Sequence, residues 1–209
     1  METMQSIRKA YKALALEKKV LPLSLKETAE SAGVEFEEAK QHYEGVRSVQ
    51  EDIWLTYLRD TLEAMEASPE FAEYLVREKL LAFYFTLFEM MGEDREFLQL
   101  FQSKLGIWNY DPDFLMPFKA AFIEFVEMLV EEGASNEEVT ERMVLGGQYA
   151  GWHWPQMLYL LNHWIDDTTE AFVKTDQAIE KSVNLGFDIM GRNVLDSAFD
   201  FMKFVVTRR

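Results

Sequence analysis

The sequence contains no cysteine and only three histidines, so it has few of the side chains that bind transition metals. Without cysteine there can be no disulfide and no thiolate metal site. The three histidines, His42, His153 and His163, are too few to build a typical zinc cage. We therefore expect neither a metal ion nor another cofactor.

Long apolar runs and catalytic motifs are also missing. No segment approaches the roughly 18 uninterrupted apolar residues that a membrane-spanning helix requires. The N-terminal stretch METMQSIRKAYKALALEKK has charges every few residues and no apolar signal core. The chain has no phosphate-binding loop, no G-x-S-x-G turn and no H-E-x-x-H pair. These absences predict a cytoplasmic protein that does not span a membrane and is not an enzyme.

Positive charge is scarce over most of the chain. Residues 1–50 hold eight Lys/Arg and eight Asp/Glu, whereas residues 51–209 hold thirteen Lys/Arg and twenty-nine Asp/Glu, giving the net charge of −16. Because nucleic acids are polyanions, the longer segment would repel them. If the protein binds DNA, only the first segment can do so.

The sequence instead has abundant apolar residues at helical spacing and almost no strand pattern. We therefore predict an all-α fold with a small head at residues 1–48 and a helical body at residues 49–209. The stretch LLAFYFTLFEMM, residues 80–91, is apolar all round and predicts a helix buried on every side. Gly151 and Pro155 predict a kink or break in a later helix.

The head has the pattern of two short helices separated by a tight turn. Ser24 is suited to cap a helix that ends near Ala32, with Glu27 three residues later as in a capping box. Gly33 is suited to the left-handed turn that follows. The next helix is expected from Phe36 to Tyr43.

The segment SLKETAESAGVEFEEAKQHYEGVRSV resembles the helix-turn-helix of the TetR family of transcriptional regulators. The framework positions of that family are matched by Leu25, Ala29, Gly33 and Val34. The resemblance implies a DNA-binding head and a ligand-binding, dimerising body. It also implies that double-stranded DNA would contact the head through Lys26, Thr28, Lys40, Gln41, His42 and Tyr43.

The second helix of this head is acidic, which opens a second interpretation. Glu37 and Glu38 stand where the family has small or hydroxyl residues, and Val46 replaces its usual lysine. A weaker resemblance, over residues 163–183, is to TetR-fold lipid-binding proteins of ubiquinone biosynthesis, which do not read DNA. The alternative is therefore a small-molecule or lipid-binding protein whose head no longer binds DNA.

Aromatic and methionine side chains are concentrated in the body. They fill an ordinary core or line an apolar pocket between helices, where an apolar or aromatic small molecule would bind. The candidate pocket residues are Phe85, Phe88, Phe118, Phe122, Phe125, Met128, Tyr149, Trp152, Trp154 and Met157.

The C-terminal segment carries two apolar stripes at helical spacing. One stripe can pack on the body, and the other would then be exposed, which is typical of an interface. The second stripe consists of Leu195, Phe199, Met202 and Val206. We therefore expect a homodimer that is formed through these residues.

Overall fold

The computed structural model describes residues 2–105, 109–136 and 149–190, with only the backbone given at 149–152 and 188–190. Within these ranges the secondary structure is helical and contains no strand. The predicted all-α fold is confirmed. The predicted dimer residues, Leu195, Phe199, Met202 and Val206, lie outside the described residues.

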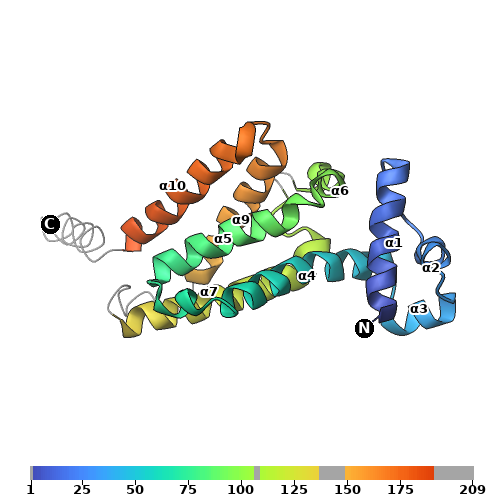
Figure 1. Cartoon of the computed structure of the whole chain (residues 1–209), viewed down its shortest axis with the longest axis horizontal. Coiled ribbons are helices and arrows are strands. Elements are labelled where there is room, and N and C mark those ends of the chain that lie inside the picture. Colours follow the sequence, from blue (N-terminus) through green and yellow to red (C-terminus); the bar gives the residue numbers. More distant parts are fainter. Residues whose placement is uncertain (1, 106–108, 137–148, 191–209) are drawn as a thin grey trace, which may run out of the picture.

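The head consists of three helices that stand at one end of the molecule (Figure 1). They are α1 (Glu2–Lys18), α2 (Leu25–Ala32) and α3 (Phe36–His42). The ends of α2 and α3 differ from the predicted ends by at most one residue. The backbone N–H of Glu27 donates to the Ser24 side chain at 3.3 Å, and Gly33 takes the left-handed conformation with φ 68°.

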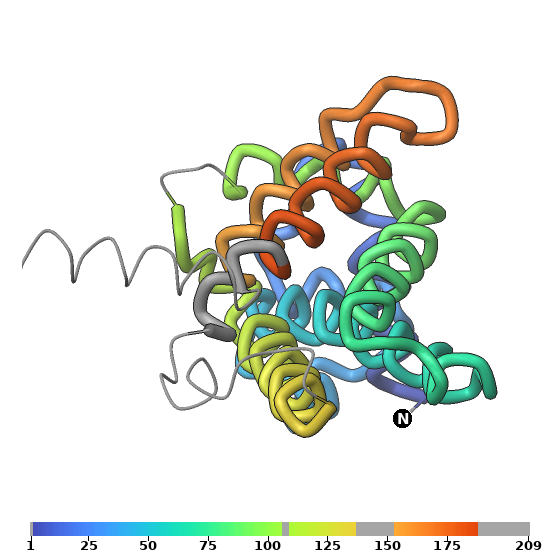
Figure 2. Tube along the Cα trace, turned by 90° about the vertical axis from the view of Figure 1, so that its left-hand side faces the viewer, coloured from blue at the N-terminus to red at the C-terminus, as the bar shows by residue number. Residues whose placement is uncertain are grey.

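The body is a bundle of five longer helices, which surround a common interior when viewed end-on (Figure 2). These are α4 (Val46–Glu66), α5 (Val76–Gly92), α7 (Met116–Ser135), α9 (Tyr149–Asp166) and α10 (Val173–Met190). Short helices lie between them: η1 (Pro69–Glu73), α6 (Arg95–Gln99), η2 (Gln102–Lys104), η3 (Asp113–Leu115) and η4 (Glu170–Phe172). The predicted domain boundary at residue 48 falls in the first turn of α4, so one continuous helix leads from the head into the body.

One prediction about the body helices is wrong. Residues 80–91 are not buried on every side, because the Phe85 side chain is 36% exposed and Glu89 is also exposed. The buried positions of α5 follow the i, i+3, i+4 spacing of an amphipathic helix, including Phe83 and Leu87. Of the predicted kink or break near Pro155, a break is excluded, because Pro155 lies inside the continuous helix α9.

The turn between α9 and α10 is held by one buried carboxylate. Asp167 is 5% exposed and accepts hydrogen bonds from the backbone N–H and the hydroxyl of both Thr169 and Thr175, at 2.5 to 2.9 Å. Burial alone would raise the pKa of Asp167, but these four hydrogen bonds lower it below the ordinary value of 3.8. The bonds also hold a turn in which Ala171 and Phe172 both have positive φ. Residues other than glycine rarely adopt this conformation.

We predict that Asp167→Asn lowers the free energy of unfolding by about 2 kcal/mol at neutral pH, because the amide cannot accept all four hydrogen bonds. A carboxyl group with a lowered folded-state pKa stabilises the protein above its unfolded pKa and loses this effect as the pH falls through the folded pKa. The difference between wild type and variant should therefore shrink progressively below about pH 4. Urea unfolding followed by circular dichroism at several pH values measures this difference.

The matched control is Asp166→Asn, which removes the same charge from the neighbouring, exposed residue. We expect this variant to change the unfolding free energy by less than about 0.5 kcal/mol. Equal losses in the two variants would show that the Asp167 carboxylate does not hold the turn.

Candidate functional site

The predicted DNA-contacting residues divide into an exposed group and a buried group. The side chains of Lys26, Lys40, Gln41 and His42 are exposed on α2 and α3. Thr28 is fully buried, and its hydroxyl donates to the backbone carbonyl of Ser24 at 3.0 Å.

Tyr43 is also buried, at 3% exposure, and its hydroxyl donates to Asp52 at 2.5 Å. Burial and the Asp52 carboxylate raise the pKa of Tyr43, so the phenol stays protonated and keeps this bond. The assignment of Thr28 and Tyr43 as DNA contacts therefore needs correction. In this structure both side chains pack inside the head, where a DNA groove cannot reach them.

Most positive charges of the head are already paired with carboxylates. Of its eight Lys and Arg residues, Lys9 is the one for which the described part of the chain provides no ion-pair partner. The pairs are Arg8–Asp52, Lys12–Asp94, Lys18–Glu27, Lys19–Glu96, Lys26–Glu30, Lys40–Glu37 and Arg47–Glu51. A phosphate that contacts one of these cations must compete with a carboxylate.

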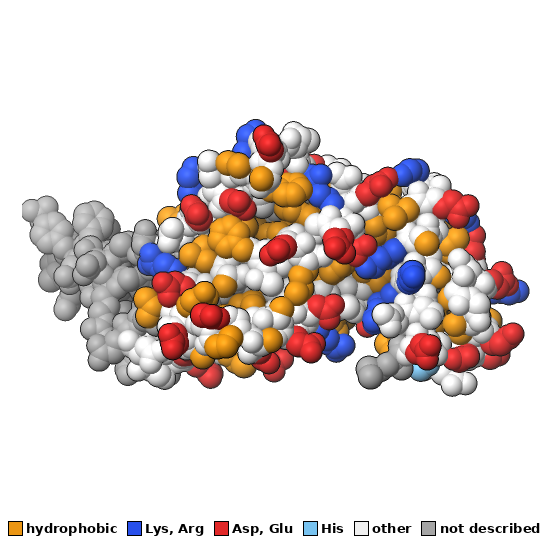
Figure 3. Space-filling view, viewed as in Figure 1, with side chains coloured by type: hydrophobic (Ala, Val, Ile, Leu, Met, Phe, Trp, Pro, Cys, Tyr) orange, Lys and Arg blue, Asp and Glu red, His pale blue; other side chains and the backbone are white. Residues whose placement is uncertain are grey.

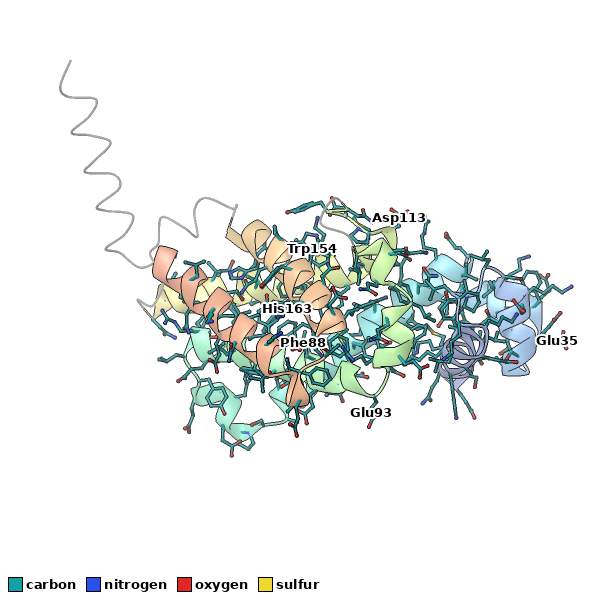
Figure 4. All side chains as sticks on the ribbon, turned by 90° about the horizontal axis from the view of Figure 1, so that it is seen from above. Glu35, Phe88, Glu93, Asp113, Trp154 and His163 are labelled. Atoms are coloured by element: carbon teal, nitrogen blue, oxygen red, sulfur yellow. The ribbon has the colours of Figure 1, made fainter. Side chains whose placement is uncertain are left out.

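The outer surface of α3 is acidic. Glu37 and Glu38 are exposed, and Glu35 projects from the start of the helix at the far end of the molecule (Figure 4). One carboxylate held about 4 Å from a phosphate costs about 1 kcal/mol in bulk water and about 4 kcal/mol at the effective dielectric of a protein surface. A surface ion pair contributes only about 0–1 kcal/mol. The glutamates of α3 therefore oppose DNA more strongly than the pairing of the lysines does.

The candidate pocket residues of the body also divide into two groups. Six of them are buried between the helices: Phe88, Phe118, Phe122, Phe125, Trp154 and Met157. Phe85 and Met128 are 36% and 55% exposed, so their assignment to an interior pocket is corrected. The side chains of Tyr149 and Trp152 lie outside the described residues.

Four of the buried candidates belong to one network of ring contacts. Trp154 lies 6.4 Å from both Phe118 and Phe122, measured between ring centroids. The Phe83 ring contacts Phe122 and lies 4.8 Å from the Phe125 ring, so it connects Phe125 to this group. Phe83 was not among the predicted pocket residues. Phe88 stands apart from them and stacks on Trp164 at 5.5 Å. The interior thus provides a continuous apolar and aromatic surface from α5, α7 and α9.

The indole Nε1 of Trp54 and the imidazole Nε2 of half-buried His163 are buried atoms with no hydrogen-bond partner among the described residues. His163, Trp154 and Phe88 all lie within the bundle of the body (Figure 4). A buried polar group without a partner costs about 1–3 kcal/mol, so both atoms would gain from an acceptor or donor on a bound molecule.

Buried His153 does not have the free ring that a ligand contact requires. Its Nδ1 atom lies 2.6 Å from the Gln156 side-chain oxygen, and Gln156 donates in turn to Ser182 at 3.0 Å. Burial lowers the pKa of His153. This chain of hydrogen bonds joins α9 to α10.

A family comparison agrees with this architecture. Residues 79–205 match the family model described as Tetracyclin repressor-like, C-terminal domain, and the match covers more than half of the chain. The chain belongs to the TetR family. A comparison with curated proteins found no match. The family match covers the body, whereas the resemblance of the head to TetR regulators rests on residues 24–49.

Two consecutive residues at the start of α6 contact the head and the end of α9, respectively. The Asp94 carboxylate binds the Lys12 ammonium of α1 and accepts a hydrogen bond from the Tyr57 hydroxyl of α4 at 2.6 Å. Arg95 donates to the backbone carbonyls of Trp164, Ile165 and Asp167 at 3.2, 2.9 and 2.6 Å. A movement of the α9 end is therefore linked directly to the head.

Among the described helices none is sufficiently long and apolar to cross a membrane.

Proposed function

We propose that this protein is a ligand-responsive, DNA-binding repressor of the TetR type, controlled by an apolar or aromatic small molecule. The observation that carries this proposal is the junction at Asp94 and Arg95, which links a helix-turn-helix head to a body with an aromatic interior. A ligand that binds one body conformation better than another would shift the head and reduce DNA affinity through a coupling free energy.

DNA binding in this proposal depends on the phosphate backbone. Lys9, Lys26 and Lys40 are exposed and can approach phosphates, since the surface ion pairs of Lys26 and Lys40 are weak. Glu37 and Glu38 disfavour a close approach of α3 to the groove. Sequence-independent contacts of this kind are strongly weakened by salt.

We predict that DNA affinity is measurable at low salt and falls steeply as salt is added, because phosphate contacts release condensed counterions. Glu37→Ser combined with Glu38→Thr should tighten binding to non-specific DNA at least about tenfold, since two repulsive carboxylates are removed. Fluorescence anisotropy with labelled duplex DNA at several salt concentrations measures both effects.

A control for net charge is Glu127→Gln combined with Glu131→Gln, which neutralises two exposed residues on α7 of the body. This control should change DNA affinity much less than the head variant does. If neither the wild type nor the head variant binds DNA at low salt, the repressor proposal fails.

The second candidate function is a TetR-fold protein that binds a small molecule or lipid without binding DNA. The acidic surface of α3 and the paired cations of the head favour it. Both candidates share the body ligand, so ligand binding does not separate them. The measurement of DNA affinity separates the two candidates.

We predict that fatty or aromatic compounds bind the body and raise its melting temperature. When the free ligand concentration is about 100 times the Kd, binding stabilises a protein by about 2.7 kcal/mol. The Trp154 indole lies among Phe118 and Phe122, so its fluorescence should change in the same titration. Trp154→Phe should abolish most of this change.

The matched control is Trp164→Phe, which removes a buried tryptophan that stacks on Phe88 instead. This variant should retain the Trp154 signal. If a broad panel of apolar compounds alters neither the melting temperature nor the fluorescence, the aromatic residues form only a core.

The proposal includes a homodimer in which two heads meet one DNA duplex. The family match supports it in general terms, and Leu195, Phe199, Met202 and Val206 remain the predicted contact residues. Light scattering at micromolar protein concentration measures the mass that decides this point.

A further inference from the structure

One hydrogen-bond donor in the interior of the body has no acceptor. The Trp54 side chain of α4 is fully buried, and its indole N–H finds no acceptor among the described residues. A buried tryptophan usually donates this N–H to a partner. Because an indole N–H can only donate, the group that satisfies it must be a hydrogen-bond acceptor.

The rings around Trp54 do not offer a strong acceptor. The described rings in contact with it belong to Tyr57, Phe101, Phe114 and Phe118. The Tyr57 hydroxyl is already engaged with Asp94. Phe101 and Phe118 stand nearly perpendicular to the indole, at 87° and 89°, so the N–H can face a ring. Such a contact is weaker than an N–H···O hydrogen bond, so an oxygen acceptor would still be preferred.

Phe118 connects Trp54 to the interior in which we placed the apolar ligand. Between ring centroids, Phe118 lies 6.4 Å from Trp54 and 6.4 Å from Trp154. Phe118 also stacks on Phe122 at 6.4 Å. A molecule bound against Phe118 is therefore one ring away from the Trp54 indole.

The charges of the body favour a neutral acceptor over a carboxylate. Acidic and basic side chains are spread over the outer surface of the molecule (Figure 3). Two ammonium groups lie over rings of this aromatic network, and each is already paired with a carboxylate: Lys12 with Asp94 and Lys119 with Asp111. An anionic ligand would thus bury a charge beside cations that are already paired, which costs far more than burying a carbonyl group.

We propose that the body ligand is a neutral aromatic molecule with a carbonyl group, whose oxygen accepts the hydrogen bond of the Trp54 indole. Its rings lie against Phe118, Phe122 and Trp154, and Trp54 discriminates among apolar molecules of the same shape. The ligand itself is that of the proposed function, on which this assignment rests, whereas its carbonyl group and the role of Trp54 are additional. Neither addition depends on DNA binding.

The experiment compares 9-fluorenone with fluorene, two rigid tricyclic molecules that carry a carbonyl or a methylene group at the same position. Equilibrium dialysis against the full chain measures the Kd of each compound. We expect Trp54→Phe to weaken fluorenone binding about three- to tenfold, because one hydrogen bond is lost, and to leave the affinity for fluorene within about twofold.

The matched control is Trp164→Phe, which removes another buried indole, stacked on Phe88 outside this group of rings. It should change both affinities by less than about twofold, a difference below one hydrogen bond.

The outcomes separate this proposal from the proposed function. Equal weakening of both compounds by Trp54→Phe would show that Trp54 acts by packing alone, and an unchanged affinity for fluorenone would exclude the hydrogen bond. Either result would overturn the role of Trp54 while the apolar ligand of the body still stands. If neither compound binds the wild type, the aromatic body ligand itself is contradicted, and the proposal falls with it.

A spectroscopic signature in the wild type makes the test independent of the stability of the variants. Each of the five tryptophans gives one indole N–H resonance in a ¹⁵N-labelled sample, and Trp54→Phe identifies that of Trp54 by its loss. Fluorenone should move this proton downfield, because a hydrogen bond to oxygen deshields it, and fluorene should not. If fluorenone moves none of the five resonances downfield, the carbonyl does not reach the indole and the proposal is refuted.

Discussion

The placement of the head depends on the carboxylate of Asp94 and the guanidinium of Arg95. Asp94 forms an ion pair with Lys12 of α1 and accepts a hydrogen bond from the Tyr57 hydroxyl of α4. Arg95 donates to the carbonyl oxygens at the end of α9. Because the residues are consecutive, the contact to α1 and the contact to the end of α9 are made from one short segment at the start of α6. The head is thus held by a charged contact to the body as well as by the continuous helix α4.

This arrangement leaves the ion pair between the head and α6 partly exposed to solvent. Lys12 and Asp94 are about a quarter and a third exposed, with side-chain values of 25% and 30%. A partly exposed ion pair contributes little to stability. The Arg95 guanidinium, which donates to the three carbonyls, also lies 5.7 Å and 5.0 Å from the centres of the Trp164 and Phe172 rings. The contact to α1 is therefore the weaker of the two.

Local signals in the sequence predicted the head well. Ser24 and Gly33 specify caps and turns through their own chemistry, so the helix ends could be placed without tertiary information. In α5 the apolar residues are continuous from Leu80 to Phe85, and Glu89, one helical turn after Phe85, is the acidic residue that marks the outer face. The prediction did not use this residue, so Phe85 was selected where Phe83 belongs. The burial of Thr28 and Tyr43 and the contacts of Asp94 depend on partners distant in sequence or on the packing of three helices. A local pattern does not contain that information.

The charge balance of the head also bears on why the proposed repressor would need two heads. When Lys40 or Lys26 turns to a phosphate, it leaves Glu37 or Glu30 without its partner, so the electrostatic gain of each contact is small. A head of this kind binds weakly on its own. Two heads held on one dimer raise the effective concentration of the second head near the DNA, which increases overall affinity without any new contact. The gain is lost when the geometry no longer allows both heads to bind at once. In the proposed repressor, control by a small change in head orientation would therefore be more effective than it would be with a strongly basic head.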